Sequence, residues 1–242
     1  MGGGRWAVGD GRRATADGAT GRRGDGATGR RGDGATECRL LRMSRVFLLS
    51  PARCDGKRAK MLLNPAARFE LAQRVRAPGG APIGEVFAFL SGLYFRGKLA
   101  YATAFGEPAG GYVITTDRGL VSANTPVTRE DLLAFSNVDL ATAGERYIAP
   151  LRQHAQELAR QIGDDASVVL LGSIATGKYC DTLAAVFGER LLFPSTFVGR
   201  GDMSRGGLLL RHARLGKELE YERVVGAVRH GKRPPKLERI KL

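Results

Sequence analysis

The sequence predicts an α/β fold of three layers, in which a mostly parallel central sheet carries helices on both faces. Four short apolar runs, at 46–49, 112–115, 168–171 and 190–193, have the length and composition of buried strands. Segments whose apolar residues recur at helical spacing separate these runs. Strands that alternate with helices in this way are typical of a parallel sheet covered on both sides.

The elements are expected in the following order. Strands are predicted at 45–49, 112–116, 167–171 and 190–193, with a last strand at about 219–224. Helices are predicted at 61–76, 84–105, 129–136, 144–162, 176–187 and 203–215, after a polar loop that runs to about residue 60. The helix at 84–105 should break near Gly92. Thr128 has the side chain of an N-cap, with Asp131 three residues later as a capping-box partner.

Residues 1–42 have the composition of a disordered, low-complexity segment. The octad 17–24 recurs at 25–32 and begins again at 33–36, and it has almost no apolar side chains with which to offset the entropy of ordering. Met43 leads directly into a strand, so we expect Met43 to be the true start, with a basic disordered arm as the alternative. Residues 43–230 then form a single α/β domain, followed by a basic, loose tail at 231–242.

The charge favours an anionic partner. The formal net charge is +14, and it remains +10 without residues 1–42. Such a balance favours nucleic acid, a nucleotide or a phosphorylated metabolite, although a generally basic surface would give the same number. The three cysteines form no metal-spaced pair, so we expect no metal, no cofactor and a reducing, cytoplasmic compartment. No apolar run approaches the roughly 20 residues that span a bilayer, so no membrane association is expected.

Polar and cationic residues follow each of the four predicted strands. Ligands of α/β proteins bind at the carboxyl ends of parallel strands, so these residues should form one cationic crevice. The candidate substrate-binding residues are Ser50, Arg53, Lys57, Arg58, Arg118, Ser173, Thr176, Lys178, Ser195, Arg200, Ser204 and Arg205. The candidate catalytic residues are Asp117 and Asp202, which would orient water or stabilise a developing oxocarbenium ion.

Two of these segments have simpler explanations. Gly172, Gly177 and Lys178 nearly match the phosphate-binding P-loop, but Tyr179 stands where a Ser or Thr should hold magnesium. A tight strand-to-helix turn explains the spacing as well, and the N–H groups of 173–177 would then form a weak anion site. In the Gly-rich stretch 199–207, the side chains at 202 and 204 would equally serve as helix caps.

The segment 93–101 mixes aromatic rings with cations. Rings beside Arg or Lys can stack on bases, which leaves Tyr94 and Tyr101 open as base contacts. More often such rings are core, with the cations on the opposite face of the helix, and core is the interpretation we favour for Phe95 and Leu99.

The segments 93–102, 113–115, 119–120 and 124–127 resemble an uncharacterised bacterial family with features of the YaaA-like peroxide-stress proteins. The loops 171–179 and 194–207 resemble, more weakly, two loops of the uracil-DNA glycosylase superfamily that grip DNA phosphates and probe the duplex. Phe193 stands where that superfamily has a His before its Pro-Ser turn, and its water-activating motif is not visible after 45–49.

The resemblance and the cationic crevice together imply an intracellular protein that acts on nucleic acid or a nucleotide, with N-glycosidic cleavage as the reaction. Two alternatives remain open from the residues: a non-enzymatic DNA-binding stress protein, and an enzyme on a small phosphorylated metabolite. The sequence does not decide whether the chain is an enzyme, and it does not give the oligomeric state.

Overall fold

The computed structural model describes residues 45–108, 110–138, 144–175 and 177–237, apart from the side chain of Lys178. The chain divides into two units, 1–41 and 42–242, and every described residue belongs to the second. This second unit has the three-layer α/β architecture that the sequence predicts.

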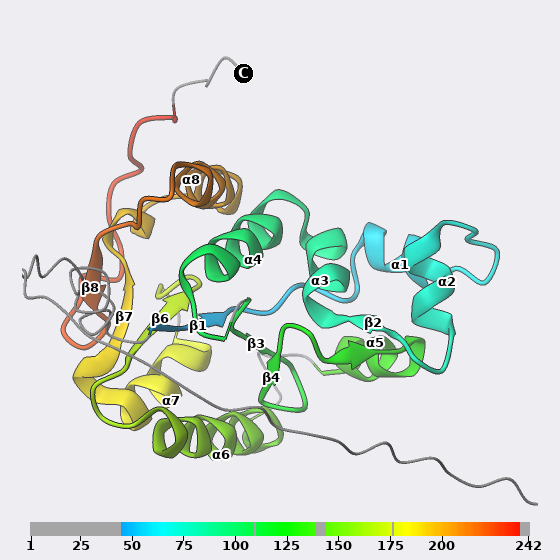
Figure 1. The fold of residues 1–242 in the computed structure, drawn as a ribbon, viewed down its shortest axis with the longest axis horizontal. Coiled ribbons are helices and arrows are strands. Elements are labelled where there is room, and N and C mark those ends of the chain that lie inside the picture. Colours follow the sequence, from blue (N-terminus) through cyan, green and yellow to red (C-terminus); the bar gives the residue numbers. More distant parts are fainter. Residues whose placement is uncertain (1–44, 109, 139–143, 176, 238–242) are drawn as a thin grey trace, which may run out of the picture. The chain divides into compact units, whose positions relative to one another are not determined.

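A six-stranded sheet forms the middle layer (Figure 1). Its strands are β1 (Arg45–Leu49), β3 (Tyr112–Ile114), β4 (Leu120–Ser122), β6 (Ser167–Leu171), β7 (Leu191–Pro194) and β8 (Tyr221–Arg223). The order across the sheet is β4-β3-β1-β6-β7-β8. The four inner strands are parallel, while β4 and β8 pair antiparallel at the two edges. The carboxyl ends of the four inner strands therefore lie at one edge of the sheet.

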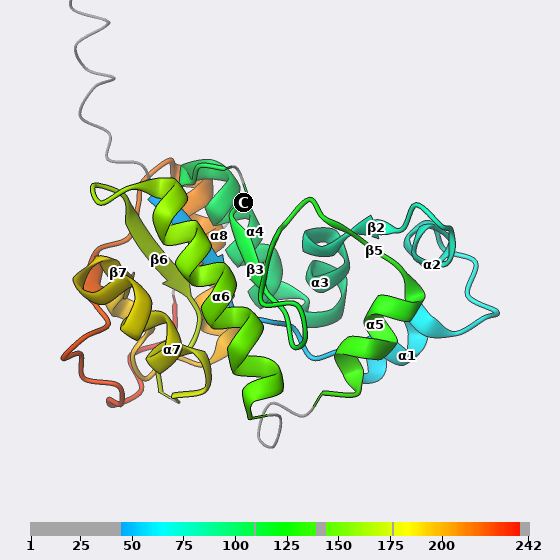
Figure 2. The same ribbon diagram turned by 90° about the horizontal axis from the view of Figure 1, so that it is seen from below.

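Helices cover both faces of the sheet because the inner strands are apolar on both sides. Along β1, Phe47 and Leu49 belong to one buried cluster, and Val46 and Leu48 belong to the other, as the two-residue period of a strand requires. The first cluster includes residues of α3 (Ile83–Ser91), α4 (Leu93–Phe105) and α8 (Asp202–Leu215). The second includes residues of α6 (Glu145–Ile162) and α7 (Gly177–Phe187), which Figure 2 shows in front of the strands.

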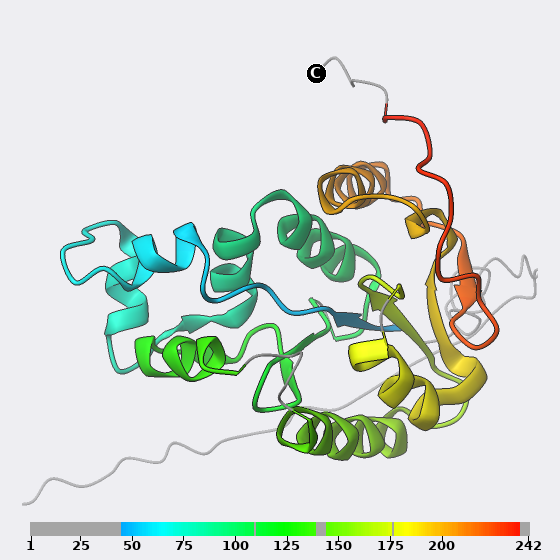
Figure 3. The same ribbon diagram turned by 180° about the vertical axis from the view of Figure 1, so that it is seen from behind.

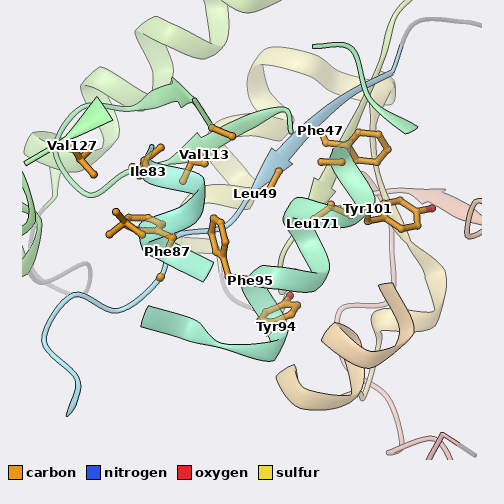
Figure 4. Close-up of a cluster of buried hydrophobic side chains, with 14 of the residues drawn as sticks. Phe47, Leu49, Ile83, Phe87, Tyr94, Phe95, Tyr101, Val113, Val127 and Leu171 are labelled. Atoms are coloured by element: carbon orange, nitrogen blue, oxygen red, sulfur yellow. The ribbon is translucent and has the colours of Figure 1, made fainter. Parts of the chain in front are cut away.

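Short elements pack around α3 beyond the end of β1. They are α1 (Lys57–Leu63), α2 (Glu70–Arg76), α5 (Arg129–Ser136) and the two-stranded pair of β2 (Ala81–Pro82) and β5 (Pro126–Val127). Figure 4 shows the core that joins them to the sheet, in which the rings of Phe87 and Phe95 meet edge to face at 5.4 Å. Their burial ties α3 to α4 and fixes where α4 lies over the strands.

Most elements lie where the sequence predicts them, and one helix does not. The predicted helix 61–76 is wrong, because two shorter helices, α1 and α2, replace it and the first begins at Lys57. Asn64 precedes Pro65 and is extended, which ends α1. The break near Gly92 is confirmed, with φ of 66° at that glycine. The capping box of Thr128 and Asp131 is also confirmed. No helix in the described ranges is long and apolar enough to span a bilayer.

The segment after β8 runs back past η3 (Ser195–Phe197) and the start of α8 (Figure 3). Arg229 pairs with Asp181 at 2.7 Å, and the carbonyl of Pro235 accepts a hydrogen bond from Arg200 at 3.4 Å. Leu237 packs against the first buried cluster. The predicted loose tail at 231–242 forms no helix or strand over its described part, 231–237, although Pro235 and Leu237 contact the domain.

Candidate functional site

The middle of the carboxyl edge holds a buried pair, Ser50 and Lys98. Ser50 follows β1 directly and is 6 % exposed, while Lys98 projects from α4 and is 1 % exposed. The Nζ atom of Lys98 donates to the carbonyl oxygen and to Oγ of Ser50, each at 2.8 Å. β1 and β6 are the middle pair of the sheet, so this contact lies where the predicted crevice should be deepest.

Lys98 was not among the predicted site residues, and the interpretation that the cations of 93–101 face away from the core is wrong for it. Tyr94, Lys98, Tyr101 and Ala102 share the buried face of α4 at spacings of three to four residues. The sequence carried one signal for the burial of Lys98, which is the spacing that places this lysine on the apolar face of the helix. Tyr94 and Tyr101 are buried as well, which is the core role that the sequence offered as the alternative to base stacking.

The surroundings of the Lys98 amine are mainly apolar. Nζ lies 4.1 Å from the ring centroid of Tyr94 and 5.0 Å from that of Phe95. No carboxylate of the described residues lies within ion-pair distance of it. Burial lowers the pKa of Lys98 to about 7, with Asp202 opposing that shift and Arg205 adding to it. Lys98 is therefore a buried amine that exchanges its proton near neutral pH.

Gly172 allows Ser50 to approach the turn after β6. A Cβ at position 172 would lie 2.8 Å from the Tyr179 hydroxyl oxygen and 2.9 Å from Cβ of Ser50. The Tyr179 hydroxyl donates to the carbonyl oxygen of Ser173 at 2.9 Å, and burial raises the pKa of Tyr179 to about 12. Tyr179, at the magnesium-binding position of a P-loop, instead closes a tight strand-to-helix turn here.

Arg205 and Asp202 lie at the start of α8, near the Ser50–Lys98 pair. Arg205 is 8 % exposed, and its Nε and Nη2 donate to the carbonyl oxygen of Phe197 at 3.2 and 3.0 Å. Oδ1 of Asp202 lies 3.5 Å from Nη1 of Arg205, and the Asp202 side chain is largely exposed. The Tyr94 hydroxyl is buried and has no hydrogen-bond partner among the described residues. Arg205 is thus held by the fold, and Asp202 is the exposed member of this group.

Two further predicted residues are also tied to the backbone. Arg200 donates through Nε to the Thr196 carbonyl at 3.0 Å, and through Nη1 to Oγ of Ser204 at 3.1 Å. Oγ of Ser195 donates to the Glu220 carbonyl at 3.4 Å. These contacts fix the loop between β7 and α8.

Asp117 and Arg118 form a second polar group at the end of β3. Arg118 pairs with Asp131, lies 3.8 Å from Oδ1 of Asp117, and has its guanidinium 5.3 Å from the Phe135 ring centroid. Oδ1 of Asp117 is buried and accepts no hydrogen bond from the described residues. Burial raises the pKa of Asp117, against the effect of Arg118. No hydrogen bond or ion pair among the described residues joins Asp117 to the Ser50–Lys98 pair, whereas Asp202 is close enough to Lys98 to raise its pKa.

The loop after β1 carries the most exposed cations of the predicted site. Arg53 pairs with Asp55 at 2.8 Å, and Arg58 donates to the carbonyl of Phe89 at 3.0 Å. Lys57 begins α1 and is exposed, with no side-chain partner in the part of the chain that the structure describes. Thr176 and the side chain of Lys178 lie outside the described residues.

The described residues contain no cluster of three or more His, Cys, Asp or Glu side chains that could hold a metal ion. Comparison with protein-family models, with curated proteins and with solved structures finds no match to this chain.

Proposed function

We propose that this protein binds nucleic acid or a nucleotide at the carboxyl edge of its sheet and acts on it chemically there. The observation that carries the proposal is the parallel order of β1, β3, β6 and β7, which places four polar loops at one edge with the Ser50–Lys98 pair in the middle. The net charge of +14 and the exposed Lys57 favour a polyanionic or phosphorylated ligand at that edge.

A substitution tests the proposal only where the cation does not also hold the fold together. Arg205 is buried, and Arg118, Arg200 and Arg58 donate to internal acceptors, so their substitution would disturb the fold as well as any phosphate contact. Lys57 is exposed without a described partner, which makes Lys57→Ala the informative change. Lys217, exposed after the far end of α8, provides a matched Lys217→Ala control with the same loss of charge.

The experiment measures binding of the full chain to labelled single- and double-stranded DNA across a salt series, beside a thermal-shift panel of nucleotides and sugar phosphates. We expect binding that falls steeply with salt, or stabilisation by a nucleotide. Lys57→Ala should lower the slope of log affinity against log salt for duplex DNA by about 0.9, and Lys217→Ala should leave it unchanged. The proposal would be overturned if the chain bound no DNA and no nucleotide stabilised it, or if only a sugar phosphate stabilised it.

N-glycosidic cleavage stays a prediction for this edge. It requires Asp117 or Asp202 to orient water or to stabilise positive charge on the sugar. Release of free base from a nucleotide or from DNA should then be lost in Asp117→Asn or Asp202→Asn while binding persists. Full release of base by both variants would contradict these roles.

A further inference from the structure

We propose that Ser50 is a covalent nucleophile, that Lys98 is its general base, and that the substrate is a phosphate ester. The choice of a phosphate ester rests on the function proposed above, whereas the nucleophile and the base rest on the buried pair alone.

The pair has the geometry that proton transfer needs. The 2.8 Å between Nζ of Lys98 and Oγ of Ser50 lies within the range for a nucleophile and its base. A second hydrogen bond at 2.8 Å, from Nζ to the Ser50 carbonyl, holds the amine in place. A neutral amine has two N–H groups and one lone pair. If one N–H stays on this carbonyl and the other faces the Tyr94 ring, the lone pair of the neutral amine is left to accept the proton of Oγ.

Burial makes the neutral amine accessible at physiological pH. The side chain is 1 % exposed, and the nearest charges are the Asp202 carboxylate, outside ion-pair distance, and the Arg205 guanidinium. The resulting pKa of about 7 leaves a large fraction of Lys98 free to accept the hydroxyl proton of Ser50. Arginine in the same place would remain protonated and could not act as a base.

A purely structural role explains the pair less well. A buried amine without a carboxylate partner costs stability that a methionine of similar length would not. Tyr94, whose ring packs against the Lys98 amine, adds a second costly group, because its buried hydroxyl has no hydrogen-bond partner among the residues that the structure describes. Buried polar groups that lack partners need an explanation, and a functional site is one such explanation.

The reaction has two balanced steps. Oγ of Ser50 forms a bond to phosphorus while the ester P–O bond to the leaving alcohol breaks. The Oγ proton moves to Nζ of Lys98 and from there to the leaving oxygen. Water then attacks the phosphoserine with loss of its proton to Lys98, the P–Oγ bond breaks, and Ser50 regains the proton. The net change is hydrolysis of the phosphate ester by one water.

The test is covalent labelling of the full chain with diisopropyl fluorophosphate, followed by intact and peptide mass spectrometry. This small probe suits a serine that is 6 % exposed, and its phosphorus takes Oγ as fluoride leaves. We expect one adduct, on Ser50, formed at a rate that rises through about pH 7 and then levels off. Ser195 is the internal control, since its Oγ donates to the Glu220 carbonyl and forms no hydrogen bond with a Lys or His side chain among the described residues.

Substitution separates the base from the fold. Lys98→Met and Lys98→Arg should slow labelling by about 100-fold or more, the usual contribution of a general base. Tyr94→Phe removes the unpartnered hydroxyl and keeps the ring against Lys98. It should keep the pH profile of labelling. If both Lys98 variants unfold, the wild-type pH profile decides the question.

Each outcome is informative. No adduct on Ser50 at any pH, a rate indifferent to pH, or equal rates in wild type and folded Lys98→Arg would overturn the nucleophile and its base. A protein that binds DNA without labelling keeps the proposed function and loses this inference. A protein that labels but binds no nucleic acid or nucleotide keeps the pair and loses the phosphate-ester substrate.

Discussion

Gly97 of α4 lies directly against Gly206 of α8, with no room for a side chain on either. A Cβ at Gly97 would lie 2.5 Å from the carbonyl oxygen of Gly206, and a Cβ at Gly206 would lie 2.6 Å from the carbonyl oxygen of Leu93. Both obstacles are backbone atoms, which cannot rotate away. This close crossing holds α4 in place, and with it the neighbouring residue Lys98.

Gly97→Ala should therefore destabilise the fold, although alanine favours a helix by about 1 kcal/mol over glycine. We expect a net loss of roughly 1–3 kcal/mol from overpacking, measured by urea unfolding. Gly207→Ala is the matched control on α8, since its Cβ would meet only a side-chain carbon of Leu237, at 3.5 Å. The control should be neutral or stabilising, and equal losses at both positions would contradict a specific close contact at Gly97.

The buried amine of Lys98 should make stability depend on pH. Its pKa is about 7 in the folded chain and 10.5 when unperturbed, so the unfolded chain binds more protons between these values. Stability then increases as pH rises, by about 1.4 kcal/mol per pH unit relative to Lys98→Met. The check is urea unfolding of both proteins from about pH 7.5 to about pH 9.5, where a constant difference would mean that Lys98 keeps its ordinary pKa when folded.

Thr128→Ala should shorten or fray α5. Oγ1 of Thr128 accepts from the Asp131 N–H at 3.5 Å, and the Asp131 carboxylate accepts from the Thr128 N–H at 2.8 Å. Losing the cap should cost about 1 kcal/mol in the free energy of unfolding. Thr103→Ala, at an exposed threonine whose hydroxyl bonds back to the Leu99 carbonyl within α4, should cost nothing.

Cys54 and Cys180 should resist alkylation while the chain is folded. Burial, helped by Asp55 and Asp117, raises the pKa of Cys54 to about 12, and burial likewise raises that of Cys180 to about 12. Only thiolates react, so a Cys38→Ser variant should take up iodoacetamide at pH 8 only after denaturation. Rapid labelling of the native variant would show that these thiols are accessible.

The strands were predictable because they are buried on both faces. The predicted ranges 45–49 and 167–171 match β1 and β6, since parallel inner strands are continuous apolar runs with polar ends. The break at Gly92 and the cap at Thr128 followed from single residues with strong local preferences. By contrast, β4 is three residues long and pairs only at the sheet edge, which is too short to give a periodic signal.

The candidate site was harder to predict, because the contacts that define it come from distant segments. The predicted arginines have the right donors for phosphate, but Arg200 and Arg205 direct them to nearby carbonyl groups. The same guanidinium can bind a phosphate or a backbone carbonyl group, so composition cannot distinguish a ligand-binding arginine from a structural one. Lys98 was missed because a lysine among aromatic residues normally faces solvent, and only the packing of α4 on β1 and α8 buries it.

The position of β1 in the sheet sets an order for folding. β1 is the first strand in the chain, yet it lies in the middle, where Arg45 pairs with Ser167 and Leu48 with Tyr112. During synthesis the apolar side chains of β1 emerge long before β6. They therefore stay unpaired with β6 while most of the domain is translated. Pairing between such distant segments predicts slow folding, and a nascent chain that depends on chaperones until β6 has been synthesised.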